Sequence, residues 1–125
     1  MGLLDIFKLK ARVLPAELTP DNFSPSIKNS PVPVLVDFYS NTCAPCAQMA
    51  KTVTKFATDL QGRVRVGAFN IENDETGKIV VPFKVRAVPT LIFFNKGEPV
   101  ETFVGVTGYL KLKDVLEKLE LENKG

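Results

Sequence analysis

Histidine is absent from the sequence, and so is tryptophan. Without histidine, the chain has no Ser–His or Cys–His catalytic couple and no Cys2His2 zinc finger. Cysteine is nearly absent as well, because Cys43 and Cys46 are the only two. These absences remove most of the chemistries that would compete with a role for the paired thiols.

Long apolar runs and segments of one charge are also missing. No apolar run approaches the length of a membrane span, so we expect no membrane association. The net charge of +2 is spread along the chain, so we expect no nucleic-acid partner. Asp5, Lys8 and Lys10 interrupt the apolar region of a secretory signal, and Ile6 breaks the N-myristoylation pattern. We therefore expect a cytoplasmic protein, and in that compartment a close cysteine pair is more often catalytic or metal-binding than structural.

The apolar content is sufficient for one conventional core, because 45% of the 125 residues are hydrophobic. A nearly unbroken apolar run over residues 32–39 is typical of a strand buried on both faces. Turn residues at 95–98 lie between two apolar runs and predict a β-hairpin. The patterns predict strands over residues 32–39, 63–71, 90–94 and 100–104, and helices near 23–27 and over 45–60, 74–81 and 109–122. This order indicates a single α/β domain with a central mixed sheet flanked by helices.

Residues 1–15 form an N-terminal amphipathic extension ahead of a domain that we place over residues 16–123. Pro15 ends the segment. The favoured interpretation is an extra N-terminal helix that covers one edge of the core. A weak membrane-surface anchor is the alternative, which so short a segment supports poorly. Apolar and basic side chains fall on opposite sides of this helix, namely Leu3, Leu4 and Phe7 against Lys8, Lys10 and Arg12.

The two cysteines stand as Cys43-Ala44-Pro45-Cys46, where the strand over 32–39 gives way to the helix over 45–60. A CxxC at such a junction indicates a redox dithiol. Residues three apart on a helix share a side, which brings the two sulfurs within bonding reach. Pro45 suits a first helical turn, so Cys43 falls at the helix N-terminus, where a thiolate is stabilised. Thiols in such positions have pKa values of roughly 3.5–7.5 instead of about 8.5.

We therefore expect Cys43 to be the attacking nucleophile. Cys46, one turn into the helix, should be more buried and act second, as the resolving cysteine. For the motif alone, two alternatives stay open: a pair of buried core cysteines, or half of a metal site shared by two chains. The metal alternative is weaker because Ala44-Pro45 starts a helix instead of a metal-binding knuckle.

Two further residues stand out around the motif. Asp37 lies inside the apolar strand, where burying a carboxylate is costly, so it should be partly protonated or specially solvated. If it points under the helix N-terminus, it is placed to accept a proton from Cys46. The alternative is that Asp37 is solvated by water at an edge of the sheet. Val88-Pro89-Thr90 opens the third strand, and spacing alone favours an ordinary trans proline there.

The strand Asp37, the Cys43–Cys46 motif, Val88-Pro89-Thr90 and Gly105, in this order, resemble the thioredoxin family. The resemblance covers residues 18–121. It implies a thioredoxin fold, a thiol–disulfide oxidoreductase activity and a cis Pro89 whose loop faces the dithiol. It also implies that the backbone of Val88 pairs with the substrate chain like an added strand.

The same resemblance implies a docking surface around Cys43. Its members are Ala44, Pro45, Val88 and Gly105, with Thr42 at the position that usually carries the family's tryptophan.

The chain departs from the family pattern at other positions too. The family usually has glycine at the position of Ala44, a helix-kinking proline at that of Lys51, and a buried lysine beside the strand aspartate at that of Ala68. Without that lysine, the pKa of Asp37 should lie higher.

The favoured function is a cytoplasmic protein-disulfide reductase that serves electron transport and cell redox homeostasis. Cys43 and Cys46 would reduce disulfide-containing client proteins, and a thioredoxin-reductase-type electron donor would restore the dithiol. We expect a monomer with no metal and no cofactor besides its own disulfide. The alternatives are a more oxidising oxidase or isomerase, and a non-catalytic thioredoxin-fold interaction domain.

Overall fold

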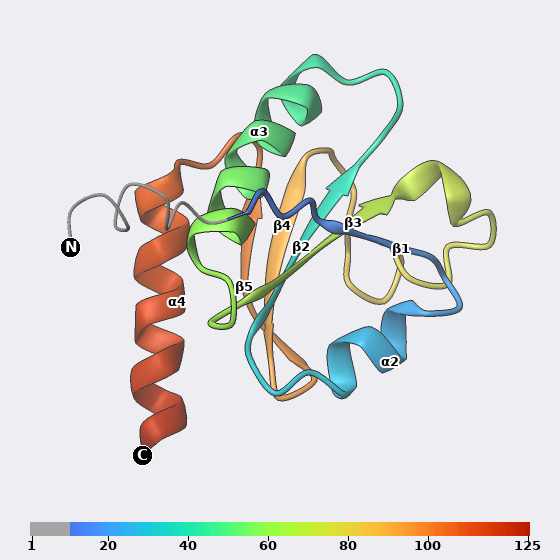
Figure 1. Ribbon diagram of the computed structural model, residues 1–125. Coiled ribbons are helices and arrows are strands. Elements are labelled where there is room, and N and C mark those ends of the chain that lie inside the picture. Colours follow the sequence, from blue (N-terminus) through green and yellow to red (C-terminus); the bar gives the residue numbers. More distant parts are fainter. Residues whose placement is uncertain (1–10) are drawn as a thin grey trace.

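A computed structural model describes residues 11–125 of the protein (Figure 1). A short 3-10 helix, η1, covers Ile71–Asn73. None of the helices described is long and apolar enough to span a membrane. The strands are β1 (Ala16–Leu18), β2 (Val34–Tyr39), β3 (Arg65–Asn70), β4 (Thr90–Asn95) and β5 (Glu98–Val104), and the α-helices are α2 (Phe23–Lys28), α3 (Ala44–Asp59) and α4 (Tyr109–Lys124).

The strands form one mixed sheet in the order β1-β3-β2-β4-β5. β2 lies at its centre, parallel to β3 and antiparallel to β4. A parallel pair needs a crossover connection, which α3 supplies between β2 and β3. β4 and β5 are joined by a tight turn in which Lys96 and Gly97 have φ values of 55° and 85°. The predicted mixed sheet is confirmed, and its central strand leads into the cysteine motif.

Side chains of β2 alternate between two hydrophobic cores, because successive strand residues point to opposite faces. Leu35 packs in the core beneath α3 and α4. Val36 and Phe38 pack in the other core, beneath α2. Figure 1 shows α3 and α4 on one side of the sheet and α2 on the other. By the same alternation, Asp37 lies on the α3 side.

An apolar stripe fixes how α3 rests on the sheet. Its buried residues recur at intervals of three and four, the spacing of one helical face. This face packs on the sheet, so the first turn of α3 follows directly from the end of β2. The buried residues of the stripe are Cys46, Met49, Val53, Phe56 and Ala57.

The predicted helix over residues 74–81 is wrong, because the chain forms a series of turns there. Gly77 has φ +71°, a left-handed conformation that interrupts a right-handed helix. The Asp74 Oδ2 atom accepts hydrogen bonds from the backbone N–H groups of Ile79 and Val80, both at 2.9 Å. Hydrogen bonds to this carboxylate therefore stabilise the turns, where a helix would have backbone hydrogen bonds.

Strand β1 has no counterpart among the predicted elements, because three residues are too few to show an alternating pattern. It is recognised only by its parallel pairing with β3. The predicted N-terminal helix falls mainly on residues 1–10, which lie outside the described residues. Residues 11–15 have no regular secondary structure. They lie along α3, where the Val13 N–H donates to Thr58 Oγ1 at 2.9 Å and Gln61 Nε2 donates to the Ala11 carbonyl at 2.7 Å.

Candidate active site

Cys43 and Cys46 form a disulfide at the N-terminus of α3, with their Cα atoms 5.1 Å apart. Cys43 is the N-cap residue in an extended conformation, and Pro45 lies in the first turn. The Cys43 sulfur accepts a hydrogen bond from the Cys46 backbone N–H at 3.1 Å. Cys43 is half-buried, whereas Cys46 is only 4% exposed. The more accessible sulfur is therefore the one that caps the helix.

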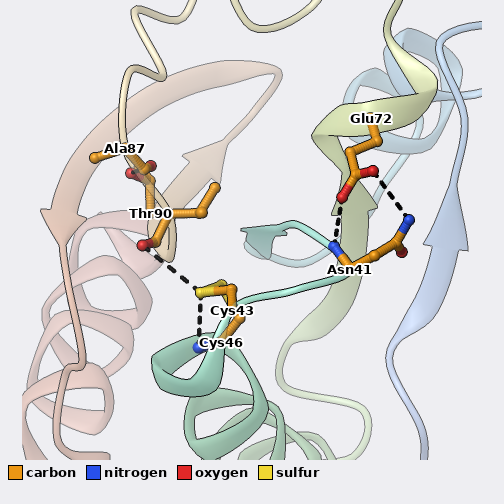
Figure 2. The surroundings of a disulfide bond; sticks show 7 residues. Asn41, Cys43, Cys46, Glu72, Ala87 and Thr90 are labelled. Carbon is orange, nitrogen blue, oxygen red and sulfur yellow. Dashed lines mark hydrogen bonds between the residues drawn. A yellow bond between two sulfur atoms is a disulfide. The ribbon is translucent and has the colours of Figure 1, made fainter.

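The loop before β4 faces this sulfur. The Val88–Pro89 peptide bond is cis, the configuration that the resemblance implies and that spacing alone did not favour. Cys43 Sγ lies 3.9 Å from the Val88 carbonyl oxygen, close enough for the reduced thiol to donate a hydrogen bond to it. Thr90 Oγ1 donates to the Ala87 carbonyl at 2.6 Å and holds the loop closed. Figure 2 shows this loop, with Ala87 and Thr90 labelled, beside the cysteine pair.

Gly105 lies beside the same loop, because its N–H donates to the Pro89 carbonyl at 2.8 Å. Its φ of +94° favours glycine, although a Cβ atom there would meet nothing within 4 Å. The segment is also tied to α3, since the Thr107 N–H contacts Met49 Sδ at 3.3 Å. The loop, the glycine segment and the helix thus form one rigid rim around Cys43.

The predicted docking residues all lie on or near this rim. Thr42, Ala44 and Pro45 are exposed, and Val88 and Gly105 are half-buried. Two exposed apolar neighbours were not among the predicted site residues. Val104 and Val106, on either side of Gly105, are 70% and 49% exposed. Apolar residues flanking a glycine after a predicted strand were the available signal.

Asp37 is buried in the centre of the sheet, with only 2% of its surface exposed. The alternative of a wet edge position is therefore wrong. Its Oδ1 atom has no hydrogen-bond partner among residues 11–125. Its direct neighbour on β3 is Ala68, which offers no polar group. Burial raises the pKa of Asp37 to about 7, because the ionised form is poorly solvated.

A cavity of about 590 Å³ connects this carboxyl group with Cys46. Asp37, Cys46 and Ala68 all line it. Its other walls come from the first turns of α3, from the segment between β2 and α3, and from the segment before β1. The cavity therefore places a carboxyl group with a near-neutral pKa on the same space as Cys46.

Asn41 and Glu72 form a clamp behind the motif that the sequence analysis did not identify. The Asn41 N–H donates to Glu72 Oε2 at 2.6 Å, and Asn41 Nδ2 donates to Glu72 Oε1 at 3.1 Å (Figure 2). Asn70 Nδ2 donates to Asn41 Oδ1 at 2.8 Å. The Asn41 side chain is thereby held from two directions, two residues before Cys43. No local pattern signals this clamp, because its partners are about thirty residues apart.

The pH dependence of stability should reveal the buried carboxyl group. The pKa of Asp37 is raised from 3.8 to about 7, so its protonated form favours folding, and this contribution is lost as pH rises from about 4 towards 7. We expect Asp37→Asn to leave the stability of the oxidised protein almost unchanged at pH 4. At pH 8.5 we expect it to stabilise the protein by up to about 4 kcal/mol.

Urea unfolding of the oxidised protein across this pH range measures the effect, with the exposed Asp114→Asn as the control. An advantage of Asp37→Asn that is the same at pH 4 and pH 8.5 would contradict the raised pKa.

Removing the clamp should loosen the chain before Cys43. We expect Glu72→Ala to destabilise the protein by about 1 kcal/mol, because two charge-assisted hydrogen bonds at an exposed site are lost. The Asn41 amide should also exchange its hydrogen faster. Glu75→Ala, which removes another exposed carboxylate from the following turn, is the matched control. Equal effects of both variants would show that the clamp contributes nothing.

The disulfide itself is the redox group of this site. Within residues 11–125, no group of three or more His, Cys, Asp or Glu side chains is placed to hold a metal ion.

Comparison with known proteins agrees with this geometry. The Thioredoxin family profile matches residues 14–118. Thioredoxin 1 of Nostoc sp. is 33% identical over 103 residues, which cover 82% of this chain and 94% of that protein. The thioredoxin of Buchnera aphidicola is 36% identical over 103 residues, covering 82% and 93%. A solved mutant thioredoxin from Halobacterium salinarum matches with a TM-score of 0.75 and 28% identity, over 85% of this chain and 90% of that one.

The mixed sheet and its helices therefore have the thioredoxin fold. With both cysteines of the motif in place, the chain is a thiol–disulfide oxidoreductase. By its profile match and by its relatives, it belongs to the thioredoxin family.

Proposed function

We propose that this oxidoreductase works as a reductase of protein disulfides. The observation that carries the proposal is the buried Asp37 carboxyl, which shares a cavity with Cys46 and has no hydrogen-bond partner on Oδ1 in the described chain. A carboxylate near the dithiol disfavours further negative charge, so it destabilises thiolates relative to the disulfide. Proteins with a strongly stabilised reduced form are oxidants, and the Asp37 carboxylate acts against such stabilisation.

The first step of the proposed cycle belongs to Cys43. Its thiolate attacks one sulfur of a client disulfide, a mixed disulfide forms, and the other client sulfur leaves as a thiolate. The Cys46 N–H that donates to the Cys43 sulfur stabilises the attacking thiolate, together with the N-terminal end of α3.

The second step belongs to Cys46 and Asp37. Asp37 accepts the proton of the Cys46 thiol, directly or through water in the cavity, and Cys46 attacks the Cys43 sulfur. The second client sulfur leaves as a thiolate, and the Cys43–Cys46 disulfide seen in the structure forms. A pKa of Asp37 of about 7 suits this role, since a large fraction of the carboxyl is ionised at neutral pH.

Client chains dock on the rim around Cys43 in this proposal. An extended client segment pairs with the backbone of Val88, whose carbonyl lies 3.9 Å from the Cys43 sulfur. Exposed Thr42, Ala44 and Pro45 contact it on one side, and Gly105 contacts it on the other. A dithiol electron donor of the thioredoxin-reductase type uses the same rim to restore the reduced form, because it must reach the same sulfur.

The setting of the cycle is also part of the proposal. A reductase needs a compartment that keeps its thiols reduced, for which we propose the cytoplasm. There the protein would contribute to electron transport and to cell redox homeostasis. We assign residues 16–123 to the thioredoxin domain and residues 1–15 to an extension. The start of β1 at Ala16 and the end of α4 at Lys124 support these boundaries.

Trapping tests the proposed order of attack. Reduced Cys46→Ser, mixed with an oxidised client protein, should accumulate a mixed disulfide on Cys43, because the resolving thiol is gone. Cys43→Ser should give little adduct, since Cys46 is only 4% exposed. Non-reducing electrophoresis and mass spectrometry identify the adduct, and a dithiol reagent should release it.

The wild-type protein is the positive control and should end as the internal disulfide, with the client reduced. Equal adducts on both variants would overturn the assignment. The assignment would also be overturned if Cys46→Ser formed no mixed disulfide with the client although its Cys43 still reacted with an alkylating reagent.

A further inference from the structure

The cavity beside Asp37 has the size of a ligand site. Its volume of about 590 Å³ lies within the range of roughly 300–1,000 Å³ that is typical of small-molecule pockets. Four parts of the fold line it: the first turns of α3, the segment before β1 together with Glu17 of β1, the strands β2 and β3, and the segment between β2 and α3 with Ser40, Asn41 and Cys43. Ordered hydrogen bonds hold the second of these against α3, so the wall is part of the folded domain.

An unpartnered acceptor lies at the base of this cavity. Asp37 is 2% exposed, and its Oδ1 atom finds no donor in the described part of the chain. Buried carboxyl oxygens are almost always hydrogen-bonded or paired with a cation. The opposite residue, Ala68, leaves this space open, because a methyl group neither fills it nor donates to it.

The walls between the base and the opening are mainly apolar. Small alkyl side chains from α3 and β3 line one side, and an apolar pair from the N-terminal segment lines the other. This lining suits a short hydrocarbon chain. The residues are Ala47, Ala50, Val53 and Ala68 on the first side, and Leu14 and Pro15 on the second.

The charged side chains at the opening of the cavity do not neutralise the Asp37 carboxylate at its bottom. Arg12, Lys51 and Glu17 line the cavity but are exposed, so water and salt screen them. Tyr39 donates its hydroxyl to Glu17 at 2.8 Å, and its pKa is raised to about 12 by burial and by Glu17, so it stays neutral. Cys46 is in the disulfide and does not titrate. Asp37 is therefore the buried charge that a ligand would meet at the base.

We propose that this cavity binds small primary alkylammonium ions, with the ammonium group on the Asp37 carboxylate and the alkyl chain along the alanine-lined wall. An ammonium group is compact and offers three donors, which suits a nearly fully buried carboxyl with an unpartnered oxygen. A planar guanidinium is wider, and an anion would meet a like charge. Cys43, which the client-docking rim surrounds, also lines this cavity, so the ammonium site adjoins the rim. Binding at the buried Asp37 does not depend on the direction of the redox reaction.

The test is a titration of the oxidised wild-type protein with n-butylammonium chloride at pH 8.5 and constant ionic strength, followed by NMR. We expect saturable shifts with a millimolar dissociation constant, centred on Asp37, Ala47, Ala50 and Ala68. n-Butanol, which has the same chain without the charge, should bind at least tenfold more weakly. At pH 5 the affinity for n-butylammonium should fall at least tenfold, because Asp37, with its pKa of about 7, is then protonated.

Variants separate the proposed contacts from general effects. Asp37→Asn should weaken n-butylammonium binding at least tenfold, and Ala68→Leu should abolish it by filling the space. Asp114→Asn, an exposed control on α4, should leave the dissociation constant unchanged. Urea unfolding of each variant establishes that it is folded. Absence of saturable shifts in the wild-type protein, or equal binding of n-butanol, would overturn the proposal.

Two further binding measurements identify the source of the ammonium group. If the chain's own Lys51 occupied the base, Lys51→Met would tighten n-butylammonium binding several-fold, and this outcome would overturn the proposal. If the occupant were a lysine of another protein, Nα-acetyl-lysine amide would bind at least tenfold more tightly than n-butylammonium, and a free amine would then be the wrong source. Trapping of clients by Cys46→Ser needs no ligand, so failure of this proposal leaves the proposed reductase function untouched.

Discussion

The site depends on one hydrogen bond, from the Cys46 backbone N–H to the Cys43 sulfur at 3.1 Å. A helix leaves its first N–H groups without partners, and here a sulfur atom accepts one of them. Through this contact, the more exposed of the two cysteines caps the helix. The central strand β2 delivers Cys43 to this position, and the buried stripe of α3 fixes the rotation of the helix.

The second constraint is the cost of keeping Asp37 inside the sheet. Most positions of β2 are occupied by apolar side chains that pack in one of the two cores. A carboxyl in their midst, facing Ala68 across the sheet, lowers stability whenever it is ionised. In the proposed cycle that cost has a use, because a carboxyl with a near-neutral pKa both exchanges protons and disfavours thiolates beside it. The loss of stability and the proposed chemistry thus depend on the same buried carboxyl group.

Much of this could be predicted from the sequence because it is encoded locally. The run over 32–39, the CxxC at a helix start and the turn at 95–98 each specify their own structure over a few residues. The burial of Asp37 followed from its apolar neighbours. The cis configuration of Pro89 did not follow from spacing and came only with the family resemblance. The client-binding roles of Val88 and Gly105 likewise rest on that resemblance.

What could not be predicted depends on contacts between distant segments. β1 exists only through its pairing with β3, and the clamp joins Asn41, in the segment between β2 and α3, to Glu72 in η1. The turns at 74–81 were mistaken for a helix because the left-handed Gly77 and the bonds to Asp74 outweigh a helical pattern. The cavity beside Asp37 is likewise a product of assembly, since it is enclosed by segments that are separate in sequence.

The central claim is that this dithiol is a reductant, and a redox titration of the purified protein tests it most directly. The protein would be equilibrated with defined thiol–disulfide buffers, and its dithiol fraction would be read by alkylation and mass shift. The account predicts an internal Cys43–Cys46 disulfide with a reduction potential near about −270 mV, as in reducing thioredoxins. A potential between about −180 and −120 mV, as in isomerases and oxidases, would contradict it. Failure to form any internal disulfide would contradict it equally.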